Sequence, residues 1–402
     1  MTVPVQRAPS APGAPNHFEP PAPHAHKPEP SAALVHRPGL DGVRGIAILL
    51  VLVYHFVTQA VPLAPTSAVG KGIVSTLAYG WSGVDLFFVL SGCLITGILL
   101  EARGVPGRAR AFYGRRALRI FPLYYLLVVG VAGVAWLAGI RAGAVTFVHE
   151  HQAWYWAFVP NGLATYLNTV DVPLFFLWSV AIEEQFYLIW PWIVWSVRRD
   201  RTLAMICAAG IAGSLAFRTW LWATGRSYVP GYVLPFARAD ALLAGGLIAI
   251  AVRNGYLTAA LRRNLWWAAG VSAVALVVFH AANLGVPTRI FGYSLNVVIA
   301  AACVTAAHDA GGAWANPVLR WFGRYSYGLY MLHPFLLSPL HHVWDKVGLP
   351  PNGAVAVVVA ACAFFGFVAL ACGAALTSWT LMEGPALRLK RYFPLTPGGA
   401  TR

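Results

Sequence analysis

Two side chains able to do chemistry, those of Arg44 and His55, stand eleven positions apart in the first long apolar run of the sequence. Eleven helical residues make three turns plus about 20°, so both side chains share one helix face, about 16 Å apart along the axis. His55 is the only group in this run that exchanges a proton near neutral pH, as a hydroxyl attacking a thioester would require. Arg44 stays charged and suits a phosphate or carboxylate. The pair predicts a base and an anion contact; the structural alternative is a packed histidine and a helix-end anchor.

Further ionisable side chains stand within other apolar runs. A charge at mid-membrane costs roughly 2.5–3.5 kcal/mol, so each needs a partner or a wet cavity. Any single one could be a structural ion pair. Because they fall in different runs, we expect them to converge on a shared polar interior, the usual place for a site in a helical membrane protein. They are Asp85 in 83–92, Glu183, Glu184 and Tyr187 in 178–187, Arg238 and Asp240 in 237–246, and His333 in 325–334.

A basic stretch at 103–119 contains Arg115, Arg116 and Arg119 at the start of the third predicted helix. Two of the three share a helix face, and their planar guanidinium groups match the oxygens of phosphates. This arrangement suits a nucleotide-like donor. The alternative is an ordinary basic loop retained on the cytoplasmic side of a membrane.

The apolar runs that must position these groups are long enough to span a hydrocarbon core of about 30 Å. They predict an all-α, polytopic transmembrane helix bundle of about ten spans. Segment 141–173, which contains Trp154, Tyr155 and Trp156, is expected to be an interfacial or re-entrant connection. The predicted helices lie near 43–62, 76–100, 119–139, 174–196, 203–223, 233–252, 264–284, 290–308, 326–344 and 354–381.

Composition supports the membrane assignment. Of the 402 residues, 58% are hydrophobic and only 11% are charged, whereas a soluble domain carries about 25% charged residues. The net charge of +15 does not indicate nucleic-acid binding, because the arginines form short clusters between apolar runs rather than a basic face with interleaved aromatics. We therefore expect a multi-pass protein of the cell membrane with no nucleic-acid partner.

The distribution of Lys and Arg predicts the topology. Most of the 29 basic residues fall on one side if the N-terminus is cytoplasmic, and an even number of spans returns the basic C-terminus to that side. Residues 1–36, rich in Pro, Ala and His, are expected to be a disordered cytoplasmic tail. We assign 37–385 to one transmembrane domain and 386–402 to a basic cytoplasmic tail.

Five motifs in this chain resemble those of acyltransferase family 3, membrane proteins that O-acylate sugars, polysaccharides and some natural products. The resemblance extends from about Leu40 to Glu383. Several motifs in the same order make the match specific. They are Leu-Asp-Gly-Val-Arg-Gly at 40–45, the run 83–92, Arg-Arg-Ala-Leu-Arg-Ile-Phe-Pro at 115–122, the run 178–187, and the run from Ser326 to His333.

The resemblance implies roles for individual positions. The family's Arg-X10-His element implies a donor contact and a catalytic base, its Arg-x-x-Arg element further donor contacts, and its acidic and late-histidine motifs further site residues. Val180 replaces the leucine of the acidic motif, which is a mild departure. The corresponding residues are Arg44, His55, Arg116, Arg119, Glu183 and His333.

The resemblance also implies the reaction. An acyl group such as acetyl passes from acyl-CoA, a co-substrate, to a hydroxyl of a carbohydrate or of a glycosylated natural product such as a macrolide. We expect His55 to remove the hydroxyl proton, oriented by Glu183 or Asp85. An acyl-histidine intermediate is the alternative to base catalysis. No metal or bound cofactor is expected. Candidate oxyanion donors or acceptor-site groups are Tyr187, Arg238, Asp240 and His333, with backbone N–H groups.

Some members of the family carry a GDSL-type hydrolase domain after the last helix. About twenty residues follow the last predicted helix here, so we expect no such relay, and a two-domain peptidoglycan acetyltransferase is less expected than an exopolysaccharide or natural-product acylase. A transporter or flippase with a proton relay is the rival class, although no paired halves are evident. A sensory or scaffolding protein is disfavoured by the number of buried ionisable groups.

Overall fold

The protein is a bundle of helices. The computed structural model describes residues 1–2, 37–140, 143–309, 311–348 and 351–394, and these ranges contain helices and connections but no strand. The predicted tail 1–36 lies almost wholly outside the described residues, as do residues 395–402. The longer helices are α1 (Pro38–His55), α3 (Gly83–Glu101), α4 (Arg108–Val128), α9 (Leu177–Ser196), α10 (Asp200–Ala223), α12 (Pro235–Arg253), α13 (Ala259–Ala281), α14 (Gly285–Ala307), α15 (Pro317–Leu332), α16 (Pro334–Val347) and α17 (Gly353–Ser378).

Shorter helices connect or extend the long ones. They are α2 (Ala68–Ala78), α5 (Ala135–Leu137), α6 (Gly143–Glu150), α7 (Gln152–Trp156), α8 (Pro160–Leu167), α11 (Tyr228–Val233) and α18 (Gly384–Arg388). Single turns of π-helix follow α1, α4 and α17 at Phe56–Ala60, Val129–Val134 and Trp379–Glu383, and 3-10 turns lie at Tyr79–Ser82, Gly312–Ala315 and Leu389–Tyr392.

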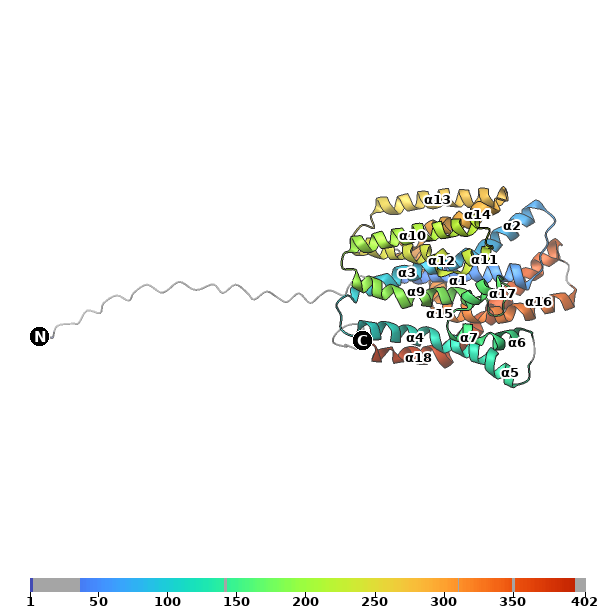
Figure 1. The fold of residues 1–402 in the computed structure, drawn as a ribbon, viewed down its shortest axis with the longest axis horizontal. Helices are drawn as coiled ribbons and strands as arrows, with labels where there is room; N and C mark the ends of the chain where they lie inside the picture. The colour runs from blue at the N-terminus through green and yellow to red at the C-terminus, as the bar shows by residue number, and fades with distance from the viewer. Residues whose placement is uncertain (3–36, 141–142, 310, 349–350, 395–402) are drawn as a thin grey trace.

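Helices α1 and α3 form the centre of the bundle. Helix α1 packs on α15 and α3, and α3 packs on α12, which packs in turn on α10. Helices α13 and α14 form one flank, whereas α4 and α18 form the opposite flank (Figure 1). The site residues predicted from the sequence lie on α1, α3, α4, α9 and α12, and His333 directly follows α15.

Glycines allow the two closest crossings. A Cβ atom built on Gly45 of α1 would lie 2.0 Å from the Leu319 carbonyl oxygen of α15, and one on Gly323 would lie 1.9 Å from the Asp41 carbonyl oxygen. At the α3–α12 crossing, a Cβ on Gly92 would lie 1.9 Å from the carbonyl oxygen of Leu242. Small residues let helix backbones approach closely where lipid supplies no hydrophobic drive for association.

Eight of the helical segments in the described residues are long and apolar enough to cross a membrane. The protein is thus a multi-pass membrane protein, but the predicted count of ten spans and the sides of the termini remain predictions. Helix α9 corresponds to the predicted span 174–196 but is not one of these eight segments. Its glutamates, its glutamine and its tryptophans lower its mean hydropathy.

Three predicted helices are wrong in detail. The run 326–344 is divided between α15 and α16, because Pro334 has no N–H to continue the ladder and begins the second helix. The run 76–100 begins within α2, and the 3-10 turn Tyr79–Ser82 separates α2 from α3. The third helix begins at Arg108, eleven residues before the predicted 119.

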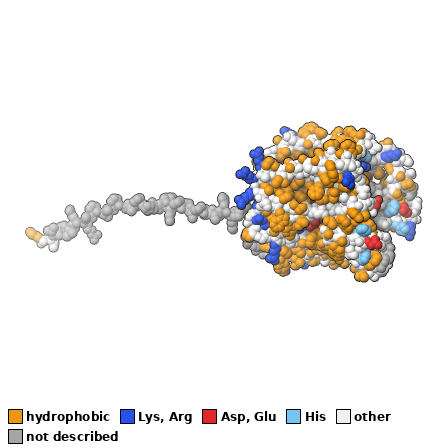
Figure 2. All heavy atoms as spheres, viewed as in Figure 1, with side chains coloured by type: hydrophobic (Ala, Val, Ile, Leu, Met, Phe, Trp, Pro, Cys, Tyr) orange, Lys and Arg blue, Asp and Glu red, His pale blue; other side chains and the backbone are white. Residues whose placement is uncertain are grey.

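Lys and Arg side chains gather at the end of the bundle where α4, α10 and α13 begin (Figure 2). We call this the basic end and the opposite one the far end. Between the last turn of α4 and the first turn of α9, residues 143–167 form the short helices α6, α7 and α8. Their interfacial or re-entrant placement stays a prediction.

We expect a glycine-to-alanine substitution to lower stability at a close helix crossing but not at an open helix surface. Gly92→Ala should force α3 away from the Leu242 carbonyl of α12 and destabilise the fold by about 1–3 kcal/mol, the usual cost of overpacking. Gly213→Ala on α10, where a built Cβ meets nothing within 4 Å, should be neutral or slightly stabilising. Thermal unfolding of the two variants in detergent measures the contrast, and equal midpoints would contradict the close crossing.

Candidate functional site

Three cavities follow one another through the bundle from the basic end to the far end. The basic cavity, of about 580 Å³, is lined by the first turns of α1 and α4 and the last turns of α3 and α12. The middle cavity is much smaller, about 110 Å³. The outer cavity, about 930 Å³, lies at the far end and contains His55. Each cavity shares wall residues with the next.

Cations dominate the basic cavity. Arg44 comes from α1, and Arg116 and Arg119, one turn apart, come from the inward face of α4; all three line the middle cavity as well. Asp41 lies 3.4 Å from Arg44 and offsets only part of this charge. An anion with several negative charges is the ligand that such a wall would stabilise. The other ionisable residues in the wall are Arg37, Arg115, His308 and Lys390.

The C-terminal segment contributes to this wall. Helix α18 and the turn Leu389–Tyr392 pack on α4, and the Arg115 side chain donates a hydrogen bond of 2.6 Å to the Phe393 carbonyl oxygen. Lys390 therefore reaches the cavity, although sequence reasoning placed it in a tail. In the sequence, the amphipathic turn after Gly384-Pro385 is the feature that could have indicated a helical segment containing Lys390.

The middle cavity joins the other two. Glu183 and Tyr187 of α9 line it together with Arg44, Arg116 and Arg119. The Tyr187 hydroxyl is hydrogen-bonded to Ser91 of α3, and its ring lies 4.7 Å from the Arg116 guanidinium. The predicted donor contacts and the predicted acid are therefore brought to one place.

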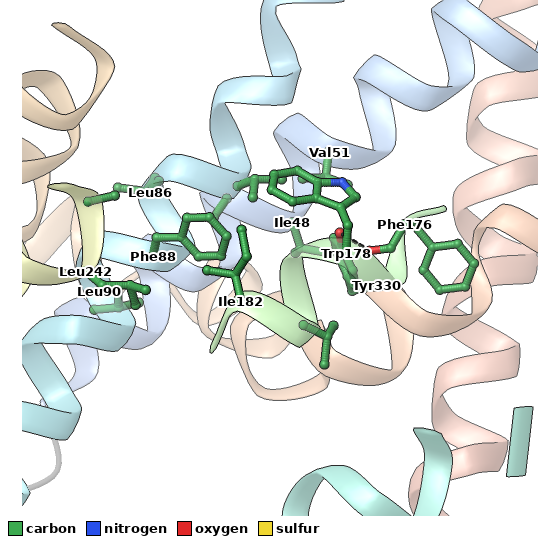
Figure 3. Close-up of a cluster of buried hydrophobic side chains, with 14 of the residues drawn as sticks. Ile48, Val51, Leu86, Phe88, Leu90, Phe176, Trp178, Ile182, Leu242 and Tyr330 are labelled. Carbon is green, nitrogen blue, oxygen red and sulfur yellow. Dashed lines mark hydrogen bonds between the residues drawn. The ribbon is translucent and has the colours of Figure 1, made fainter. Parts of the chain in front are cut away.

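Aromatic rings surround the outer cavity. Tyr232 lies 4.7 Å from Trp178 and 6.2 Å from Tyr293, measured between ring centroids, and all three rings line the cavity. Figure 3 shows Phe176 and Trp178 beside Tyr330, close to α1. Polar groups in the same wall are His55, Gln59, Asp171 and Ser338.

Tyr330 and Val84 are common to the middle and outer cavities, so they mark the passage between them. The Tyr330 hydroxyl donates to the Phe176 carbonyl oxygen at 3.0 Å and is also bonded to Ser179. Sequence analysis did not single out Tyr330, although it lies three residues before His333 on α15. Its role depends on a contact across helices that no local pattern specifies.

His55 has a different partner from the one expected. Its Nδ1 lies 2.9 Å from the Val51 carbonyl oxygen and 3.3 Å from Nε2 of His333. No hydrogen bond joins it to Glu183 or Asp85 within the described part of the chain. The expectation that one of these carboxylates orients His55 is therefore not met by the geometry, because each is held by other groups.

Asp85 belongs to a buried set of ion pairs below the outer cavity. It is paired with Arg238, and both side chains are 1% exposed. Asp240 pairs with Arg218 at 2.9 Å, again at 1% exposure. Arg238 stands 4.1 Å from the Tyr293 ring, behind the aromatic wall, and none of these charged groups lines the three cavities. This arrangement fits the structural ion pairs that the sequence left open, and it removes Arg238 from contact with a ligand in the cavities.

These pairs predict a pattern of stability. Asp85→Leu alone should cost about 3–5 kcal/mol, because Arg238 is left charged in a dry interior. The double variant Asp85→Leu/Arg238→Met should recover most of that loss. Thermal unfolding of the single and double variants checks this, and an undiminished midpoint for Asp85→Leu would show that the pair is not formed.

Comparison with known proteins gives a consistent picture. Residues 37–376 match the model of a family described as an acyltransferase domain. The chain is 29% identical over 321 residues to peptidoglycan O-acetyltransferase OatA of Listeria monocytogenes, covering 74% of this chain and 48% of that protein. It is 29% identical over 343 residues to the putative peptidoglycan O-acetyltransferase YrhL of Bacillus subtilis, covering 77% and 50%.

A putative O-acetyltransferase of Staphylococcus aureus is 25% identical over 336 residues, covering 78% of this chain and 53% of that protein. The chain thus spans about half the length of the curated relatives it matches. No solved structure is similar enough to match.

Proposed function

This chain belongs to the acyltransferase domain family, and we propose that it is an O-acyltransferase that takes the acyl group from acyl-CoA and transfers it to a carbohydrate hydroxyl. The observation that carries the proposal is the series of cavities, with an anion-binding wall at one end and an imidazole at the other. The alternative of a transporter or flippase is not favoured, because family membership supplies a reaction.

The basic cavity suits the nucleotide end of acyl-CoA. Its phosphates would be held by the guanidinium groups of Arg44, Arg116 and Arg119, with Lys390 as a further point charge. Basic loops favour the cytoplasmic side of a membrane. We therefore assign the basic end to the cytoplasm, where acyl-CoA is found.

The narrow middle cavity suits the pantetheine arm rather than the nucleotide. At about 110 Å³ it takes a thin chain, so the bulky nucleotide would remain in the basic cavity. The helical rise from Arg44 to His55 is about 16 Å, which is comparable with the reach of that arm. The thioester would then arrive beside Tyr330, at the entrance to the outer cavity that contains His55.

The chemistry is direct transfer. His55 accepts the proton of the acceptor hydroxyl while its oxygen attacks the thioester carbonyl carbon. The tetrahedral intermediate collapses as the carbon–sulfur bond breaks, and the leaving thiolate recovers a proton from the imidazolium. Products are an ester and free CoA, with no net redox change. Tyr187 and backbone N–H groups are candidate donors to the oxyanion.

The outer cavity is the proposed place of the acceptor. Aromatic rings such as Trp178, Tyr232 and Tyr293 offer flat faces to a sugar ring, and His55, Gln59 and Asp171 supply polar contacts. Two of the relatives carry names that specify peptidoglycan, which supports a carbohydrate acceptor. No feature of the cavity favours a glycosylated natural product over a glycan.

The base is tested by His55→Ala and His55→Gln. Purified wild-type protein in lipid nanodiscs should release CoA from acetyl-CoA in the presence of soluble peptidoglycan fragments, with a matching acetyl increment on the fragments. Loss of the base should lower kcat by about 10²–10⁴-fold in both variants while the unfolding midpoint is retained. Undiminished kcat in either variant would remove His55 from the mechanism.

The donor site is tested by Arg119→Gln and Arg116→Gln. Each should weaken acetyl-CoA binding about 10- to 150-fold, because a charge-assisted phosphate contact contributes roughly 1.5–3 kcal/mol. Arg201→Gln is the matched control, since Arg201 is exposed at the same end and lines none of the cavities. Titration calorimetry compares the three, and equal affinities would place the donor elsewhere.

A further inference from the structure

His333 lies where α15 gives way to α16, at the level of His55 in the bundle. Its side chain is 0% exposed. Its Nδ1 lies 2.9 Å from the Leu329 carbonyl oxygen, and its Nε2 lies 3.3 Å from Nδ1 of His55. The two ring centroids lie 4.9 Å apart, and the ring planes are inclined to each other by 59°. The contact joins α1 to α15, the pair of helices that the close crossing at Gly45 and Gly323 brings together.

The carbonyl partners fix where the protons are. A carbonyl oxygen only accepts, so Nδ1 of His333 must donate to Leu329, and a neutral ring then has a bare Nε2. By the same reasoning Nδ1 of His55 carries its proton, since it faces the Val51 carbonyl oxygen at 2.9 Å. The unprotonated Nε2 of His333 is the second acceptor of a bifurcated hydrogen bond from this Nδ1–H. Nε2 of His55 is left without a proton.

We propose that His333 is a positioning residue: it holds the proton of His55 on Nδ1 and thereby leaves Nε2 of His55 as the base. The inference rests on the proposed transfer at His55. The outer cavity, which His55 lines and His333 does not, supplies the hydroxyl. His333 therefore acts through His55 and touches no substrate.

In many hydrolytic sites a carboxylate fixes the tautomer of the catalytic histidine, whereas here the neutral imidazole of His333 does so. The apolar surroundings favour a neutral partner. An acidic partner would itself need compensation in the apolar interior. Asp85 has that compensation only because Arg238 is paired with it, and Glu183 faces the arginines of the middle cavity. An imidazole fixes the tautomer without bringing a second charge to the site.

The contact between His333 and His55 also stabilises the protonated form of His55. When Nε2 of His55 takes the acceptor proton, its Nδ1–H remains pointed at two acceptors, the Val51 carbonyl oxygen and Nε2 of His333. Both stabilise the imidazolium. Two protons cannot occupy the space between the two rings, so the pair carries one positive charge at most and returns to neutrality when the thiolate is protonated.

The test compares His333→Gln with His333→Leu. A glutamine places an amide oxygen near the position of Nε2 and can still accept from His55, whereas leucine fills the volume without an acceptor. With acetyl-CoA and soluble peptidoglycan fragments, His333→Leu should lower kcat about 100-fold or more with KM for acetyl-CoA within a factor of about three. His333→Gln should keep kcat within about tenfold of wild type. In a His55→Ala background, His333→Leu should lower the residual rate no further, because the two residues act as a unit.

The inference is overturned if the two His333 variants lose kcat equally, or if His333→Leu keeps the wild-type value. If a His333 variant fails to fold, the tautomer is measured instead by ¹⁵N NMR of histidine-labelled wild-type protein in nanodiscs. The expected spectrum shows His55 protonated at Nδ1 and bare at Nε2, and the reverse tautomer excludes the arrangement. Wild-type protein that releases no CoA would instead defeat the proposed function, whereas the tautomer would still be read from the spectrum.

Discussion

An ionised side chain inside an apolar bundle needs a partner or a wet cavity, and this constraint organises the protein. Asp85 and Arg238 meet it as a pair, as do Asp240 and Arg218. Such pairs contribute little net stability, but losing one member is costly. They join α3, α10 and α12 below the aromatic wall of the outer cavity and hold that wall in position.

Other charges meet the same constraint by facing a cavity. Arg44, Arg116 and Arg119 point into a space with few acids, so their positive charge is available to a ligand. Whether an ionisable side chain is in an ion pair or faces a cavity is more informative about its role than its burial alone. The ion pairs away from the cavities shape the fold, and we propose that the charged groups at a cavity wall bind or react.

Much of this was accessible from the sequence. Apolar length predicted most helices, and helical spacing placed Arg44 and His55 on one side of α1, where they line successive cavities. Spacing along α4 likewise anticipated Arg116 and Arg119. These predictions succeed because they depend on a single helix, whose geometry is fixed by hydrogen bonds within it.

Contacts between helices were not accessible in the same way. The sequence suggested carboxylates as the partners of His55, yet the neighbour is His333, because the glycine crossing of α1 and α15 sets which residues meet. A single span was expected at 326–344, but Pro334 divides it at that histidine. Lys390 reaches the basic cavity only because the last turns fold back on α4. Partner choice depends on crossing geometry, which hydropathy does not encode.

The central claim is that one path connects the phosphate-binding arginines to His55. Its most direct test is an experimental structure of the protein in nanodiscs with a non-hydrolysable acetyl-CoA analogue. We expect the phosphates to lie among Arg44, Arg116 and Arg119, and the acyl carbonyl to lie at the passage beside Tyr330, within reach of Nε2 of His55. An analogue bound outside these cavities, or a His55 ring turned toward lipid, would contradict it.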